Sequence, residues 1–172
     1  PNGMDIFLLN NGIAYQFSKT YYPEDYWKLF TGARDHEEIS KIKTFERQIR
    51  TETWRMDMRL KGANPNAVIT ASEKCVDYTH YYNRNVTFAN HYKKVTYHDV
   101  YPGIDWIVYR IDNVLKYEFL VKAGADPSQI IFGFSDHEDL VHNPDGSLTL
   151  SNPMGSVTEK TPTGCLFFYF DC

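Results

Sequence analysis

Hydrophobic and polar positions alternate most clearly in the middle of the chain. Three runs, at Tyr92 to Val100, Ile104 to Ile111 and Val114 to Val121, alternate β-branched or aromatic residues with polar ones. Turn residues separate the runs at Tyr101-Pro102-Gly103 and at Asp112-Asn113. Alternation with a period of two places every second side chain on the same face of a strand. The pattern therefore predicts three consecutive antiparallel strands with one buried face.

The first sixty residues predict a hairpin and a further strand. Short apolar runs flank Asn10-Asn11-Gly12, a sequence that favours the left-handed backbone of a tight hairpin turn. Residues 54–60 alternate Trp, Met, Met and Leu with Arg, Asp and Arg, as expected for a strand with one wet face. The intervening residues 21–48 are charged and irregular. We expect a surface excursion there, with helical turns near Pro23 and over residues 37–42.

Turn signals divide the rest of the chain into short segments. Residues 68–70 predict a short strand, and residues 78–90 predict an exposed connection. Asp126-Pro127 predicts a single helical turn, because Asp caps helices and Pro suits the first helical position. Asn143-Pro144-Asp145-Gly146 predicts a tight turn before the last strands. About ten short strands at this spacing indicate an all-β fold, an antiparallel β-sandwich or double-sheet domain with short helical turns.

Composition supports one β-rich domain over residues 1–172. The chain is 42% hydrophobic and 16% aromatic, with 13 Tyr, 11 Phe and 3 Trp. Aromatic residues favour half-buried pleated surfaces. The net charge of −4 argues against a general nucleic-acid binder, which needs a basic face. No apolar run approaches the roughly 18 residues of a membrane-spanning helix.

The ends of the chain and its cysteines suggest a processed protein. The chain opens at Pro1 without Met, so we expect an excised piece of a larger secreted protein. Cys75 is isolated, whereas Cys165 and Cys172 lie seven residues apart. Without a C-x-x-C pair, a zinc or redox motif is not expected. Two alternatives stay open: a Cys165–Cys172 disulfide in an oxidising compartment, or unpaired thiols.

Two groups of residues have the chemistry of a catalytic or metal site. Asp99 and Asp105 flank the Tyr101-Pro102-Gly103 turn, and paired carboxylates can hydrolyse glycosidic bonds. The favoured interpretation is that both satisfy backbone donors around the turn. His137 and Asp139 belong to an acidic segment that could hold a cation, and the favoured interpretation is a solvated loop.

The remaining chemical signals are weak. His91 and His98 are seven residues apart on one predicted strand, so they face opposite sides and cannot share a metal ion. There is no G-x-S-x-G elbow and no glycine-rich phosphate loop in the sequence. We therefore expect no catalytic residue, no metal and no cofactor.

Aromatic clusters are the best candidates for binding. One cluster lies within residues 21–27 and the other within residues 78–82. Exposed rings stack on sugars or bind protein partners, and the alternative is a small satellite core beneath long loops. The candidate ligand-binding residues are Tyr22, Trp27, Tyr81 and Tyr82.

Three motifs follow one another in the middle of the chain: Y-x-x-V-x-Y-x-D-V-Y-P-G-I-D, then L-x-Y-E-F-x-V and G-A-D-P-x-x-I. They resemble an N-terminal β-rich module of large secreted surface proteins of Bacteroidetes, which often carry β-propeller-type repeats. The matching positions here are Tyr92, Val95, Tyr97, 99–105, Leu115, Tyr117, Phe119, Val121, 124–127 and Ile130, with 59–65 matching the G-A-N-P strand exit. Glu118 replaces the usual Asp, and residues 161–172 do not continue the pattern, as in an atypical or truncated terminus.

The resemblance implies a scaffold, since no catalytic residues are carried over from that module. We expect a non-catalytic structural or interaction module of a secreted or cell-surface bacterial protein. Its partners would be downstream domains of the same protein, cell-surface proteins or glycans. The alternative is a carbohydrate-binding domain that uses the exposed Tyr and Trp loops. A hydrolase based on Asp99 and Asp105 is the third hypothesis.

Overall fold

The computed structural model describes residues 2–24, 26, 40, 42–44, 46–81, 87–112, 114–161 and 163–164. Within these residues the chain forms eleven strands, the 3-10 helix η2 (Pro127–Gln129) and α-helical backbone at residues 40, 42–44 and 46. Of the helical turn predicted over residues 37–42, residues 37–39 and 41 lie outside the described part of the chain. The strands are β1 (Asn2–Leu9), β2 (Gly12–Tyr21), β3 (Arg50–Leu60), β4 (Val68–Tyr81), β5 (Thr87–Tyr101), β6 (Ile104–Ile111), β7 (Val114–Val121), β8 (Phe132–Ser135), β9 (Asp139–His142), β10 (Leu148–Asn152) and β11 (Gly155–Glu159).

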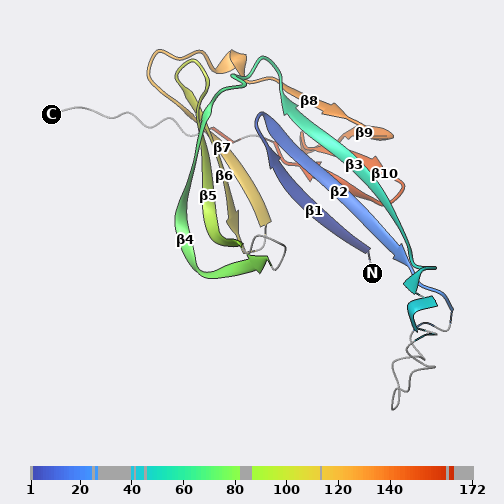
Figure 1. Cartoon of the computed structure of the whole chain (residues 1–172). Helices are drawn as coiled ribbons and strands as arrows, with labels where there is room; N and C mark the ends of the chain where they lie inside the picture. The colour runs from blue at the N-terminus through green and yellow to red at the C-terminus, as the bar shows by residue number, and fades with distance from the viewer. Residues whose placement is uncertain are drawn as a thin grey trace. The chain divides into compact units, whose positions relative to one another are not determined.

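The described strands form three sheets (Figure 1). Their strand orders are β1-β2-β3-β8, β11-β10-β9 and β4-β5-β6-β7. In the last sheet each strand pairs antiparallel with the strand before it, which needs only tight turns as connections. The prediction of an all-β, antiparallel, double-sheet fold with short helical turns is confirmed. No helix in the described part of the chain is long and apolar enough to cross a membrane.

The chain forms two compact units. Unit 1 comprises Pro1–Phe7, Ala14–Asp57 and Phe134–Cys172, and unit 2 comprises Leu8–Ile13 and Met58–Gly133. Neither unit is one continuous stretch of sequence, because β2 and β3 each contribute residues to both. The expectation of one domain over residues 1–172 stays a prediction, for which a single unfolding transition would be the signature.

The core of unit 2 is aromatic. Trp106 on β6 is fully buried, and its ring centroid lies 4.7 Å from that of Tyr97 on β5. Phe119 on β7 stacks at 6.3 Å from Trp106 and meets Phe132 edge-on at 5.9 Å. Tyr97, Trp106 and Phe119 are directly opposite one another in register, so they share one face of the sheet. We call this face the core face.

The core of unit 1 is smaller and includes specific polar contacts. Phe17 on β2 is buried, and its ring leaves no room for a side chain at position 155, where an added Cβ would lie 2.6 Å from it. The Tyr15 hydroxyl donates to Glu159 at 2.8 Å. The Trp54 indole N–H donates to the carbonyl oxygen of Asp136, also at 2.8 Å.

Most of the predicted turns and strands are confirmed. The first hairpin turns at Asn10 and Asn11, and β5, β6 and β7 follow the three alternating runs. The left-handed backbone expected of the Asn10-Asn11-Gly12 turn is not found, since none of these three residues has a positive φ. Asp126 caps η2, with its carboxylate accepting from the Ser128 N–H at 2.9 Å. Gly146 has the positive φ that its turn requires, +82°. The predicted helical turn near Pro23 is also present, since the Tyr26 N–H donates to the Pro23 carbonyl.

Two predicted connections contain strands, and one predicted strand is longer than expected. Residues 78–90 were expected to form an exposed connection, but β4 runs to Tyr81 and β5 begins at Thr87. The short strand expected at residues 68–70 is the start of the fourteen-residue strand β4. Most of β4 is exposed on both faces, so its sequence carries no apolar stripe that would reveal a strand. Asp139 to His142 form β9 rather than a loop.

Candidate functional site

The most conspicuous backbone feature of unit 2 is a bulge in β5 at Asp99. Its φ of +48° is left-handed, and the register with β6 shifts between Tyr97 and Tyr101. A bulged residue leaves the ladder, so its N–H needs another acceptor. The Asp105 carboxylate supplies it, accepting from the Asp99 N–H at 2.8 Å. This confirms the structural interpretation of Asp105.

Lys122 joins the two carboxylates. Its ammonium group lies 2.9 Å from Asp99 Oδ1 and 3.1 Å from Asp105 Oδ1. The hydrogen bonds to Asp99 and then Asp105 raise the pKa of Lys122. Burial raises the pKa of Asp105, but the Asp99 N–H and Lys122 outweigh it, so the net pKa of Asp105 is lowered. Because both carboxylates contact the same ammonium group, the three side chains form an ion-pair network.

The turn after the bulge closes against the next motif of the chain. Gly103 has φ +72°, and a Cβ built there would lie 2.9 Å from the Ala125 Cβ. The Lys122 N–H donates to the Gly103 carbonyl at 2.9 Å. On the other side, the Asn64 N–H donates to the Val100 carbonyl at 2.8 Å. The Y-P-G-I-D (101–105), G-A-D-P (124–127) and G-A-N-P (62–65) motifs therefore meet at one place, which we call the corner. Their residues fix the backbone conformation there.

Two histidines of β5 bridge neighbouring strands in a similar way. His91 lies between Asp77 (2.7 Å) and Thr79 (2.8 Å) of β4. His98 lies 2.8 Å from Thr70 and 3.7 Å from Asp105. Strand alternation places them on opposite faces of the sheet, as predicted.

These bridges tie β4 to β5, and His98 also reaches β6. The hydrogen bond from His91 lowers the pKa of Asp77, so that carboxylate is ionised at neutral pH. Among the described residues, no group of three or more His, Cys, Asp or Glu side chains could hold a metal ion. The residues around His137 and Asp139 accordingly do not gather into such a set within the part of the chain described.

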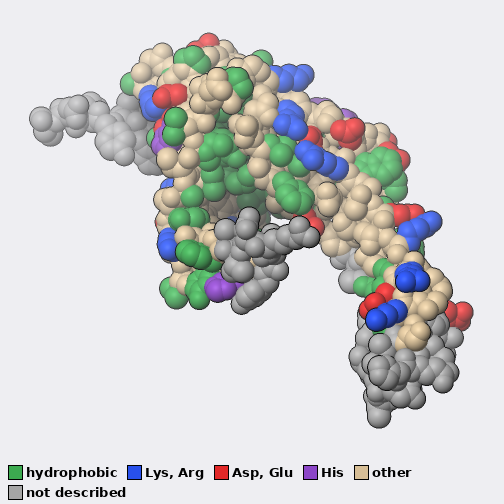
Figure 2. Space-filling view, in the orientation of Figure 1, with side chains coloured by type: hydrophobic (Ala, Val, Ile, Leu, Met, Phe, Trp, Pro, Cys, Tyr) green, Lys and Arg blue, Asp and Glu red, His purple; other side chains and the backbone are tan. Residues whose placement is uncertain are grey.

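The face of the β4–β7 sheet opposite the core face is exposed, and we call it the open face. Outside the irregular stretch of β4 between Lys74 and Tyr78, it carries the even-numbered residues of β4, β5 and β7 and the odd-numbered residues of β6. Its exposed large apolar side chains are Val68, Tyr78, Phe88, Tyr92, Ile111, Val114 and Leu120. Figure 2 shows hydrophobic side chains at the surface in the region of β4 and β5, with charged and histidine side chains beside them. Exposed apolar patches of this kind mark interaction sites.

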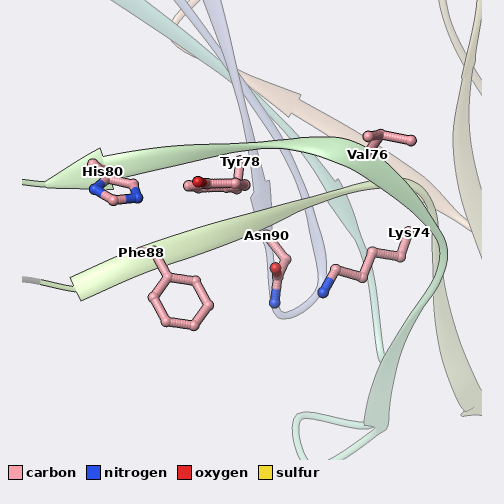
Figure 3. Close-up of a pocket in the computed structure, with 6 residues that line it drawn as sticks. All are labelled: Lys74, Val76, Tyr78, His80, Phe88 and Asn90. Carbon is pink, nitrogen blue, oxygen red and sulfur yellow. The ribbon is translucent and has the colours of Figure 1, made fainter.

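A hollow of about 440 Å³ lies on the open face toward the end of the β4–β5 hairpin. We call it the aromatic hollow. Its lining residues are Lys74, Val76, Tyr78, His80, Phe88 and Asn90 (Figure 3). The register places Tyr78 opposite Asn90 and His80 opposite Phe88. Five of the lining side chains, those of Lys74, Tyr78, His80, Phe88 and Asn90, lie on one side of the two paired strands, whereas Val76, in the irregular stretch of β4 between Lys74 and Tyr78, lies on the other side of β4 (Figure 3).

The rings of the aromatic hollow form a floor and a wall. The Tyr78 and His80 rings are 4.9 Å apart and tilted by 33°. Phe88 stands edge-on to Tyr78, at 6.3 Å and 70°. Tyr78 and Phe88 are 56% and 67% exposed, well above what a core contact would leave. The Lys74 side chain extends toward Asn90 at the other end (Figure 3).

The ligand-binding residues expected from the sequence do not form one site in the described structure. Tyr22 belongs to unit 1, where its ring lies 5.0 Å from that of the buried Tyr26. Tyr81 belongs to unit 2 and is 53% exposed, on the face of β4 opposite the aromatic hollow. Trp27 and Tyr82 lie outside the described residues, as do Cys165 and Cys172.

Sequence reasoning pointed to the second aromatic cluster but missed Lys74, Phe88 and Asn90. The signal was present in residues 74–80, where Lys, Val, Tyr and His alternate with Cys, Asp and Thr. That alternation predicts that the first four share a face, which holds for all of them except Val76. It becomes informative only if the segment is recognised as a strand.

A family model described as Domain of unknown function (DUF7948) matches residues 1–164. The chain therefore belongs to that family. No curated protein and no solved structure matches the chain.

Proposed function

We propose that this member of a family of domains of unknown function is a non-catalytic interaction module of a secreted or cell-surface bacterial protein. The open face of the β4–β7 sheet is its docking surface, and the corner is the support. The extracellular bacterial setting rests on the resemblance of the corner motifs to modules of bacterial surface proteins. Downstream domains, cell-surface proteins or glycans are the expected partners.

One observation carries the proposal: in unit 2, the ionisable side chains at the corner and the exposed apolar side chains lie in different places. At the corner, Asp99, Asp105 and Lys122 are engaged with one another and with backbone. On the open face, by contrast, Phe88 and Leu120 are 67% and 53% exposed. Polar groups that bind one another stabilise the fold, whereas exposed apolar surface is typical of a site that binds a partner.

The test is binding of the labelled chain to cells that normally produce it, after deletion of the gene. Saturable binding is expected for the wild type and should be lost in the double variant Phe88→Ser/Leu120→Ser. Tyr81→Ser is the matched control, because it removes an exposed ring from the opposite face of β4. Equal binding of all three proteins, or no saturable binding either to these cells or to the purified downstream domains, would contradict the proposal.

Carbohydrate binding is the second candidate, and the aromatic hollow is the observation that favours it. A pyranose presents one face of C–H groups, which stacks on aromatic rings. The hollow has the volume of a small-molecule site, which is about 300–1,000 Å³. Its rings come from Tyr78, His80 and Phe88, rather than from the loop residues expected from the sequence.

A further inference from the structure

We propose that the aromatic hollow binds acidic glycans, with the ring of a uronic acid on the aromatic side chains and its carboxylate on Lys74. The inference rests on the proposed function, since it assigns a ligand class to part of the docking surface. It concerns polysaccharides whose sugar rings carry carboxylates.

The aromatic side chains fit a flat ring with one free edge. Tyr78 and His80 provide the floor, and Phe88, at 70° to Tyr78, provides a side wall. A sugar ring on this floor would contact Phe88 with one edge and leave its other edge toward Lys74 and Asn90 (Figure 3). The opposite end of the hollow thus offers hydrogen-bonding groups where a pyranose carries its substituents.

Lys74 is available for an external anion. Among the described residues, no carboxylate forms an ion pair with the Lys74 ammonium group. Asn90 adds an amide that donates and accepts hydrogen bonds. A sugar carboxylate at this end would form a charge-assisted hydrogen bond, which is shorter and stronger than a neutral one.

The charge of the open face complements an anionic polymer. Lys94 and Lys116 lie on either side of Tyr109, directly opposite it on the neighbouring strands. Together with Lys74 they give the described part of this face three lysines. Its carboxylates there are Glu118 and Asp105, of which Asp105 is already paired with Lys122. The open face is therefore basic although the whole chain has a net charge of −4.

A single-stranded nucleic acid is the competing ligand, because its bases stack on aromatic rings. Proteins that bind single-stranded nucleic acids contact the phosphate backbone along a continuous basic groove. The hollow has one lysine at one end, and the neighbouring rows of the open face are apolar at Tyr92, Ile111 and Val114. This arrangement suits a polymer with about one charge per sugar better than a closely spaced phosphate chain.

The experiment measures binding of the whole chain to three carboxylated polysaccharides: polygalacturonate, alginate and hyaluronan. Fully methyl-esterified polygalacturonate is the matched ligand control, because it keeps the ring and removes the charge. Wild type should bind at least one acidic polymer roughly tenfold more tightly than the ester, a difference of about 1.4 kcal/mol. The preference should shrink in high salt, which screens exposed charges.

Variants separate the contribution of the rings from that of the charge. Lys74→Met should abolish the preference for acid over ester, whereas Lys93→Met, an exposed lysine on the opposite face of β5, should keep it. Phe88→Ser should weaken binding of acid and ester alike by about tenfold, a difference of about 1.4 kcal/mol, because it removes the side wall of the hollow. Tyr81→Ser should bind as wild type does. Circular dichroism checks that each variant is folded.

Three results would overturn the inference. They are no binding to any of the acidic polymers at low salt, equal binding of acid and ester, or binding of oligothymidylate, a single-stranded nucleic acid, that is tighter than binding of every acidic polymer. If the chain binds the gene-deleted cells but none of these polymers, the proposal of an interaction module is kept and only the acidic-glycan ligand is rejected. If the chain binds neither the cells nor the purified downstream domains nor the polymers, the proposed function is contradicted as well.

Discussion

The two halves of β5 lie in contrasting surroundings. Its second half contains Tyr97, Val100 and Tyr101, which are between 0 and 3% exposed, and the strained Asp99. Its first half pairs with the end of β4 and carries Phe88, which is 67% exposed. The same strand is therefore part of a buried corner at one end and of a two-stranded ribbon at the other (Figure 1).

The difference separates residues that hold the fold from residues that are available to partners. At the corner, a substitution removes buried contacts or strains the backbone, so its effect on stability should be large. On the ribbon, side chains gain little from folding, because they stay in water. A role for the ribbon's exposed rings must therefore come from binding. The predictions below test this division.

Trp106→Ala should cause the largest loss. Trp106 is fully buried and lies among the rings of Tyr97, Tyr117 and Phe119. Truncation of a buried Trp costs about 3–5 kcal/mol, because transfer energy is lost and a cavity remains. Urea unfolding followed by circular dichroism measures it. A loss below about 1 kcal/mol would show that this core contributes little to stability.

Gly103→Ala and Gly124→Ala form a matched pair at the corner. Both glycines have positive φ, but only the Gly103 Cβ would meet a neighbour, the Ala125 Cβ at 2.9 Å. Left-handed backbone costs a non-glycine residue about 1–2 kcal/mol, which applies to both variants. Overpacking adds about 1–3 kcal/mol to Gly103→Ala alone. Equal free energies of unfolding for the two variants would contradict the close packing of the two motifs.

Asp105→Asn should have a smaller, pH-dependent effect. The folded structure lowers the pKa of Asp105, so its stabilising contribution is present above the unfolded pKa of about 3.9. It is lost as the pH falls through the lowered pKa, because protonation then favours unfolding. We expect a loss of about 1–3 kcal/mol near pH 7, since the bonds involve a charged group. Urea unfolding at pH 7 and at pH 3 measures this effect. The difference in the free energy of unfolding between variant and wild type should be smaller at pH 3. A difference that stays constant would contradict this role.

Phe88→Ser should have the smallest effect on stability. The ring is 67% exposed, and surface substitutions usually change stability by less than about 0.5 kcal/mol. The melting temperature should therefore stay close to that of the wild type while glycan binding weakens. A large fall in melting temperature would place Phe88 in a core and remove the distinction between the halves of β5.

The corner could be predicted from the sequence to a large extent, and the ribbon could not. Pro102-Gly103 and Asp126-Pro127 have local turn chemistry that needs no tertiary information, and buried Tyr97, Ile104 and Trp106 lie on a clear period-two pattern. In the ribbon, both faces are wet, so polarity does not alternate and the strand is not apparent. The ion pairs of Lys122 with Asp99 and Asp105 depend on the bulge and on three separate segments, which no local pattern encodes.

Native-state hydrogen exchange along β5 tests the central claim most directly. The amide N–H groups of residues 94–97 should exchange only through global unfolding, because β5 is paired there with a strand on each side. Those of residues 88–91 should exchange through local opening of the ribbon, at a lower free energy. Uniform protection along the whole of β5 would contradict the division of this strand into a supporting half and a half available for binding.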